Sequence, residues 1–223
     1  LLLQTLRRHG TAAASGIGND AVAAELIASI LNLHESTGML GALLQGHPCI
    51  HIPGIDMSSG SLGQGISAAV GMALAAKMKG EDFRSYCICG DGEIEEGQVW
   101  EAAMFAGAKK LDTLTVIVDN NNLQIDGTVE EVNSPYPIPE KFAAFGFNVI
   151  EIDGHDFDAI ENAVNGAKAY KGKPTAIIMK TVKGKDVSYM ENQVGWHGSA
   201  PKQEQYEQAM EELNALSASI EAE

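Results

Sequence analysis

Blocks of apolar and polar positions follow one another along the chain and predict strands and helices in turn. Short apolar runs at 86–89 and 114–118 have the length and composition of buried strands. Between them, residues from about Glu95 to Lys110 have the character of a helix. A strand, a helix and a strand in this order form one βαβ unit, whose two strands are parallel.

The blocks on either side extend the same alternation. A helix rich in alanine and glycine is expected from Ser61 to about Lys79, with Gly80 at its end. Upstream and downstream, the expected segments are helices at 1–9 and about 21–33, a proline-containing surface loop after Gly127, a short helix at 141–145, a strand at 147–152, a helix at 157–170 capped by Asp156, a strand at 175–179, a loop at 184–200 and a polar helix at 201–218. This order predicts an α/β fold: a doubly wound parallel sheet flanked by helices.

Oxygen-bearing side chains follow both strands of the βαβ unit. Gly90-Asp91-Gly92 follows the first strand, and Asn120-Asn121 closes the second. Parallel strands end at one edge of a sheet, where ligands bind, so we expect Asp91 and Asn121 to lie close together. A carboxylate and a carboxamide suit Mg²⁺, which takes few protein ligands and completes its shell with water and phosphate oxygens. Gly-Asp-Gly alone is also typical of a surface turn. The asparagines at the end of the second strand favour a Mg²⁺–diphosphate site instead.

These motifs and their flanks resemble those of the transketolase family. Gly90-Asp91-Gly92 followed by Asn120-Asn121 is similar to the thiamine diphosphate motif, and the whole stretch 90–127 resembles transketolases in particular. Further matching segments lie at 45–48, 53–54, 59–65, 153–156, 171–175, 180–185 and 196–198. The resemblance covers about residues 44–213 and implies a thiamine diphosphate-binding domain of the PP type.

The resemblance also implies roles for individual residues. Asp91, Asn121 and the backbone carbonyl of Leu123 would bind Mg²⁺ or Ca²⁺. His47 and His197 would bind substrate hydroxyls or move protons, and Glu96 would connect the two active sites of a dimer. Glu96 also fits a simpler role, because a carboxylate in the first turn of a helix interacts favourably with the helix dipole. The residues expected to contact the cofactor are Ser61, Leu62, Gly63, Gly90, Asp91, Gly92, Glu93, Asn121, Ile125, Lys183 and His197.

The N-terminal quarter departs from the family pattern. Residues 16–20 stand where transketolases carry a Gly-His-Pro-Gly-Gly stretch, and residues 32–45 lack the Ser-Lys-Gly-His motif. Residues 15–18 are similar to the glycine-rich turn of short-chain dehydrogenases, although no strand precedes them, as a dinucleotide site requires. We therefore expect an altered helical segment at 1–45, a core that binds thiamine diphosphate and Mg²⁺ at 46–200, and a C-terminal helix and tail at 201–223.

Composition narrows the class of protein. The formal net charge of −15 argues against nucleic acid and anionic membrane as partners. No apolar run is long enough to span a membrane, and no secretory signal is visible. Cys49, Cys87 and Cys89 have neither disulfide-framework nor zinc spacing. These observations lead us to expect a cytoplasmic protein.

Several functional hypotheses follow from the resemblance. In the leading one, the chain is the diphosphate-binding, N-terminal subunit of a split transketolase, a transferase that moves a two-carbon ketol unit between phosphosugars. It would require a C-terminal subunit with the pyrimidine-binding domain, and it would assemble as a homodimer or heterotetramer. One alternative is another thiamine diphosphate enzyme, such as 1-deoxyxylulose-5-phosphate synthase or a 2-oxoacid dehydrogenase subunit. The other main alternative is a non-catalytic or engineered truncated domain, which the altered residues 10–45 favour. A further hypothesis, a nicotinamide-dependent reductase, rests only on the similarity of residues 15–18 to a glycine-rich dinucleotide-binding turn.

Overall fold

The structure of the protein is a computed structural model that describes residue 50 and residues 55–221. Several expectations lie outside these residues: the helices at 1–9 and 21–33, the altered segment at 1–45, the glycine-rich turn at 15–18, and His47.

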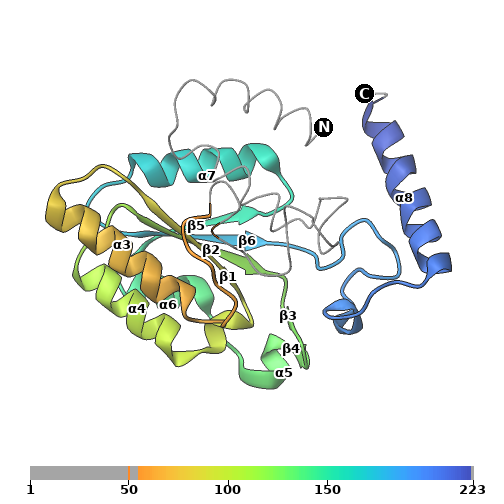
Figure 1. Ribbon diagram of the computed structural model, residues 1–223, viewed down its shortest axis with the longest axis horizontal. Coiled ribbons are helices and arrows are strands. Elements are labelled where there is room, and N and C mark those ends of the chain that lie inside the picture. The colour runs from red at the N-terminus through yellow and green to blue at the C-terminus, as the bar shows by residue number, and fades with distance from the viewer. Residues whose placement is uncertain (1–49, 51–54, 222–223) are drawn as a thin grey trace.

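Within the described residues, a parallel sheet of four strands forms the middle layer (Figure 1). Its order is β1-β2-β6-β5, with the bounds β1 Ser85–Gly90, β2 Leu114–Asn120, β5 Asn148–Asp153 and β6 Thr175–Lys180. Gly90 pairs with Asp119, while Asn120 and Asp153 both pair with Lys180, so all four strands end side by side. The predicted α/β class with a parallel sheet is confirmed, and the register places the residues after β1 beside the end of β2.

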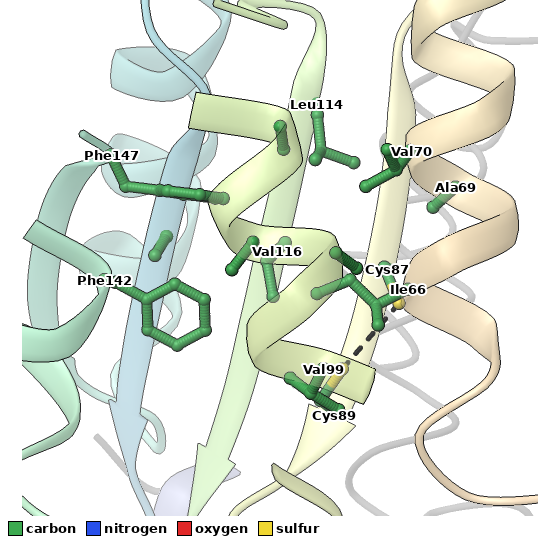
Figure 2. Packing of buried hydrophobic residues seen from close by; sticks show 14 of the residues in the cluster. Ile66, Ala69, Val70, Cys87, Cys89, Val99, Leu114, Val116, Phe142 and Phe147 are labelled. Carbon is green, nitrogen blue, oxygen red and sulfur yellow. Dashed lines mark hydrogen bonds between the residues drawn. The ribbon is translucent and has the colours of Figure 1, made fainter. Parts of the chain in front are cut away.

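Helices cover both faces of this sheet. Helices α3 (Gly65–Lys79), α4 (Gly97–Ala108) and α6 (Ile138–Ala144) lie on one face, and α7 (Phe157–Ala169) lies on the other (Figure 1). Successive side chains of a strand point to opposite faces. In β1, therefore, Cys87 and Cys89 pack with Ile66 of α3 (Figure 2), whereas Ile88 packs with the cluster on the α7 side.

Two predicted helix ends are confirmed. Gly80 ends α3 with a left-handed φ of 69°, a conformation that glycine adopts at low cost. Asp156 caps α7 by accepting hydrogen bonds from the backbone N–H groups of Asp158 and Ala159. The predicted start of α3 at Ser61 was wrong, because the helix begins at Gly65 and a turn precedes it.

The prediction of a long surface loop after Gly127 was also wrong. The segment holds a small hairpin of β3 (Leu123–Gln124) and β4 (Gly127–Thr128), then α5 (Val129–Asn133) and α6. Thr128 and Glu131 form a capping box at the start of α5. Proline is tolerated in the first turn of a helix, so Pro139 marks the beginning of α6 rather than a loop.

Helix α8 (Gln203–Glu221) stands apart from the sheet and its covering helices (Figure 1). It begins at Gln203, slightly later than expected, and it follows a loop that contains the short helix η2 (Val194–Trp196). Of its side chains only Ala209 is buried. Across the part of the chain that the structure describes, no helix combines the length and apolar character that crossing a membrane requires.

Candidate functional site

Asp91 lies at the carboxyl edge of the sheet, after β1, which is an outermost strand of the described sheet. The residue directly follows β1, its backbone N–H donates to the carbonyl of Asp119 at 3.0 Å, and the residue is only 1% exposed. Its Oδ1 accepts from the backbone N–H of Gly92 at 2.9 Å. Its Oδ2 accepts from the Asn120 side-chain amide at 2.9 Å and from the backbone N–H of Asn122 at 2.5 Å. The carboxylate is therefore held in one orientation by donors from two loops.

The electrostatic environment of Asp91 suits a bound cation. Burial raises the pKa of the Asp91 carboxyl above its usual range, the donors from Asn120, Asn122 and Gly92 oppose that shift, and the nearby Asp119 adds to it. Among the described residues, the hydrogen bonds of this carboxylate are all with neutral amide groups. A divalent cation at the carboxylate would compensate for the cost of burying its charge.

The two asparagines after β2 differ in orientation. Asn120 donates from its Nδ2 both to Asp91 and to the Tyr136 hydroxyl, the latter at 2.6 Å. Asn121 makes no hydrogen bond to Asp91 among the described residues: its Nδ2 donates to Asp119 at 3.4 Å, and its Oδ1 accepts from the backbone N–H of Leu123 at 3.0 Å. Sequence reasoning placed both strand ends together correctly, but it missed the roles of Asn120 and Tyr136. The only available signal for Asn120 was its place in the motif.

Among the residues that the structure describes, two buried side-chain oxygens at this edge have no hydrogen-bond partner: Asn122 Oδ1 and Glu95 Oε1. In the described part of the chain, no group of three or more His, Cys, Asp or Glu side chains is arranged to hold a metal ion. A metal here would therefore depend on at most two of these side chains from the described residues, together with amide or carbonyl oxygens and oxygens of a ligand. This is the ligand set that Mg²⁺ accepts, so the residues present fit a Mg²⁺–diphosphate site.

Glycines allow two further loops to approach this edge closely. A Cβ atom on Gly92 would lie 2.6 Å from Gln124 Cβ, so only glycine fits there. Gly63 is buried with a φ of +80°. The apolar side chains next to these contacts are open to solvent: Leu62 is 63% exposed and Ile125 is 64% exposed. They provide apolar surface at the border of a polar site.

Three glutamates follow Gly92 closely in the sequence, and two of them differ from the predicted helix positions. Glu93 accepts hydrogen bonds from the backbone N–H groups of Gly63 and Gly90, at 2.8 and 3.1 Å. The prediction that Glu95 and Glu96 lie in the first turn of one helix was wrong. Glu95 belongs to the 3₁₀ helix η1 (Glu93–Glu95), and Glu96 precedes α4 at the N-cap position without a side-chain capping bond. Glu96 is exposed and makes no side-chain capping bond, but its position at the N-cap is compatible with a favourable interaction with the helix dipole.

A third loop, which follows β6, brings Lys183 and His197 together. Burial and the charge of Lys183 both lower the pKa of His197. The start of this loop is attached to two neighbouring strands. The Thr181 hydroxyl donates to Asp119 at the end of β2, and the Val182 backbone N–H donates to His155 Nε2 at 2.8 Å, just after β5. Sequence analysis noted residues 153–156 as a matching segment, but it assigned no role to His155.

Not every predicted site residue joins the Asp91 cluster. Ser61 is exposed in the turn before α3, and Lys183 and His197 contribute no hydrogen bond to Asp91 among the described residues. The backbone carbonyl of Leu123 belongs to β3, and the Leu123 side chain is buried. The site thus consists of a well-determined centre at Asp91 and three loops around it.

Comparison with known proteins places this geometry in a family. The family model described as "Transketolase, thiamine diphosphate binding domain" matches residues 27–218. The chain is 43% identical over 189 residues to an apulose-4-phosphate transketolase subunit of Phocaeicola vulgatus, and 49% identical over 184 residues to the 6-deoxy-6-sulfo-D-fructose transketolase subunit SqwG of a Clostridium species. The crystal structure of transketolase from Campylobacter jejuni superposes with a TM-score of 0.72 at 34% sequence identity.

The extent of these matches differs between relatives. The matches cover 85% and 82% of this chain and 67% of each of the two subunits. The match to the Campylobacter jejuni transketolase covers 85% of this chain but only 32% of that longer chain. The similarity therefore concerns one domain of the longer enzymes and about two thirds of the shorter subunits.

Proposed function

The chain belongs to the transketolase family, and we propose that it acts as the diphosphate-binding subunit of a split transketolase. Together with a C-terminal subunit that carries the pyrimidine-binding domain, it transfers a two-carbon ketol unit between phosphosugars. The observation that carries this proposal is the buried Asp91 carboxylate, held by backbone and side-chain amides at the carboxyl edge of the sheet. Further support comes from two similar proteins that are themselves named as transketolase subunits.

In this proposal, Mg²⁺ or Ca²⁺ is bound by Asp91, by the side-chain oxygen of Asn121 and by the backbone carbonyl of Leu123. Within the described part of the chain, Asn121 Oδ1 accepts one hydrogen bond, from the Leu123 backbone N–H, and so retains a lone pair for a cation. Oxygens of the diphosphate and water complete the shell. Gly90 and Gly92 let the main chain come close to the phosphates.

When bound, thiamine diphosphate supplies the nucleophilic carbon and the ring that takes up the electron pair. The protein binds and orients that group. The exposed side chains of Leu62 and Ile125 cover apolar parts of the cofactor and exclude water from them. His197 is neutral at physiological pH because its pKa is lowered, so its imidazole can both donate and accept a hydrogen bond at a substrate hydroxyl. Lys183 offers a positive charge beside it.

The remaining parts of the proposal concern residues and partners around this centre. His47 binds substrate, and Glu96 connects two active sites across a homodimer or heterotetramer.

Cys87 and Cys89 are free and buried, in keeping with the reducing cytoplasm as the site of action. The substrates are phosphosugars. The two similar subunits are named for different sugars, so the donor of this enzyme has to be measured.

Calorimetric titration of thiamine diphosphate, with and without Mg²⁺, tests the site. We expect Mg²⁺-dependent binding to the chain in the presence of a C-terminal transketolase subunit. Asp91→Ala should weaken it by about 100-fold or more, because the variant removes the charged metal ligand. Asp126→Ala is the matched control, since Asp126 is exposed in the turn between β3 and β4 and its carboxylate accepts no hydrogen bond in the described structure. Equal binding by both variants would contradict the proposed site.

Turnover distinguishes the proposal from its alternatives. The two subunits mixed together should consume a ketose phosphate and transfer its two-carbon unit to an aldose phosphate. A preference for pyruvate as donor would instead indicate another thiamine diphosphate enzyme. Cofactor binding without turnover by the mixture would indicate a non-catalytic domain.

A further inference from the structure

The carboxylate of Glu93 connects two glycine segments that are distant in the sequence. Its Oε1 accepts from the backbone N–H of Gly63 at 2.8 Å, and its Oε2 accepts from the backbone N–H of Gly90 at 3.1 Å. Gly63 belongs to the turn at 61–64 that precedes α3, whereas Gly90 is the last residue of β1. One side chain thus fastens the turn before α3 to the end of the strand that leads to Asp91.

The turn at 61–64 also fits closely against the segment that follows Glu93. Gly63 has a φ of +80°, and a Cβ atom on it would lie 2.8 Å from Glu96 Cβ and 3.1 Å from Gln98 Nε2. The Gly63 backbone is therefore confined on one side by Glu96 and Gln98 and held by Glu93 through its N–H. Within the turn itself, the backbone bond from Gln64 N–H to the Ser61 carbonyl is long, at 3.4 Å. The contacts with residues 93–98, more than its own hydrogen bonding, keep this turn in place.

Direct binding of the cofactor is a poor explanation for the Glu93 side chain. A carboxylate repels the phosphate oxygens of a diphosphate. Both Glu93 oxygens also accept backbone N–H groups, in contrast to the buried oxygens of Glu95 and Asn122 that have no partner. Its geometry is that of a connector between two loops.

We propose that Glu93 is a positioning residue, whose carboxylate holds the turn at 61–64 against the end of β1 so that both glycine segments face one cofactor. This inference rests on the proposed function, since it assigns the two segments to thiamine diphosphate. Loss of the carboxylate leaves the buried Gly63 N–H without its acceptor and releases the turn with its exposed Leu62 side chain. Asp91 and its donors remain unchanged, so binding weakens but continues to depend on Mg²⁺.

The test compares Glu93→Ala and Glu93→Gln with the control Glu140→Gln, an exposed glutamate in the first turn of α6. Hydrogen exchange measured by NMR reports the connector itself. We expect the Gly63 amide to exchange at least about tenfold faster in Glu93→Ala, while the Val116 amide in β2 keeps its protection. Glu93→Gln retains one acceptor oxygen, so the Gly63 amide should keep part of its protection in this variant. Because this change is conservative, Glu93→Gln also serves as the test if Glu93→Ala fails to fold.

Calorimetry of the chain together with a C-terminal transketolase subunit reports the consequence for the cofactor. We expect the Kd of thiamine diphosphate in saturating Mg²⁺ to rise about tenfold in Glu93→Ala, less in Glu93→Gln and not at all in Glu140→Gln. If the Gly63 amide exchanges at the wild-type rate in Glu93→Ala, Glu93 does not hold the turn at 61–64. If that amide exchanges faster but the Kd of thiamine diphosphate is unchanged, Glu93 holds the turn without positioning it for the cofactor. If the wild-type assembly does not bind thiamine diphosphate, the proposed function and this inference are both wrong. If the wild-type assembly binds it and Glu93→Ala binds it with the same Kd, only this inference is wrong.

Discussion

At the scale of single residues, the site depends on which neighbours hold the Asp91 carboxylate. Asn120 donates to Asp91 and to Tyr136 with the same amide group, so it couples the carboxylate to the segment between α5 and α6. Asn122 contributes through its backbone, which its left-handed φ of 64° turns toward Asp91. Asn121 is left free of Asp91, and this suits a residue proposed to bind a metal ion.

We predict that Asn120→Ala lowers the free energy of unfolding by about 2 kcal/mol, because a buried carboxylate loses one of its donors. Tyr136→Phe should lower it by about 1 kcal/mol, since it removes only a neutral acceptor of the same amide. Urea denaturation of the two variants measures both values. Asn214→Ala in α8 is the control and should stay within about 0.5 kcal/mol of wild type, because Asn214 is an exposed surface residue. An Asn120→Ala variant as stable as this control would contradict the assigned hydrogen bond.

At the scale of elements, strand ends and helix ends place the loops of the site. The start of the loop after β6 is held by two hydrogen bonds. One joins Val182 to His155 just after β5, and the other joins Thr181 to Asp119 near the end of β2. The same loop continues to α8, whose attachment is polar. The Ser188 hydroxyl and backbone N–H both donate to the Glu212 carboxylate, at 2.6 and 2.7 Å. This loop, which also bears Lys183 and His197, is therefore anchored at both ends by hydrogen bonds.

The attachment of α8 should depend on pH. Hydrogen bonds from Ser188, and then from Gln208, hold the pKa of Glu212 below its usual range. For a carboxyl whose pKa is lowered in the folded state, the stabilising contribution is fully present above the ordinary value of about 4.3 and is lost as pH falls through the lowered value. We predict that the hydrogen-exchange protection factor of the Ser188 amide decreases over that range. In Glu212→Gln it should be low at neutral pH and show no such step.

Glu211→Gln is the matched control for this prediction, because Glu211 is the exposed neighbouring glutamate and no hydrogen bond to its carboxylate is recorded in the described structure. It should keep the wild-type pH profile. A protection factor of Ser188 that does not change with pH in the wild type would contradict the attachment through Glu212.

At the scale of the whole molecule, the sheet gathers the candidate site at one edge and leaves the packed core behind it. The apolar cluster under α3, α4 and α6 and the smaller cluster under α7 cover opposite faces, while Asp91 and its loops lie beyond the strand ends. The formal charge of −15 makes an anionic ligand unfavourable at long range, so a diphosphate requires the cation and the local backbone N–H groups of the site.

Ligand binding at this edge should stabilise the whole chain. At a cofactor concentration about 100 times its Kd, with Mg²⁺ present, linkage contributes about 2.7 kcal/mol. For a domain of this size, that corresponds to a rise in Tm of about 5–11 °C. Differential scanning calorimetry measures the shift, and Asp91→Ala at the same ligand concentrations should show almost none. An equal shift in both proteins would mean that the ligand binds elsewhere.

Local patterns in the sequence were sufficient for most of the sheet and for several helices, but not for the hairpin of β3 and β4 or for the start of α3. Apolar runs of strand length identified β2 and β6, because a strand buried on both faces is apolar throughout. The run at 86–89 identified β1, in which buried and half-buried positions alternate. Gly80 and Asp156 marked helix ends, because their conformational and hydrogen-bonding preferences act within one turn. Parallel topology then placed Gly90-Asp91-Gly92 beside Asn120-Asn121 without any coordinates.

Only the tertiary structure decided how the loops use these residues. The choice of Asn120 rather than Asn121 as the partner of Asp91, the two bonds of Glu93 and the bond between Val182 and His155 all join segments distant in sequence. Such contacts depend on strand register and on loop conformations set by several elements at once, and no local pattern encodes them. The sequence by itself therefore determined the sheet, its edge and the chemistry available there, whereas three-dimensional packing determined which side chains hold the site and which remain free to bind.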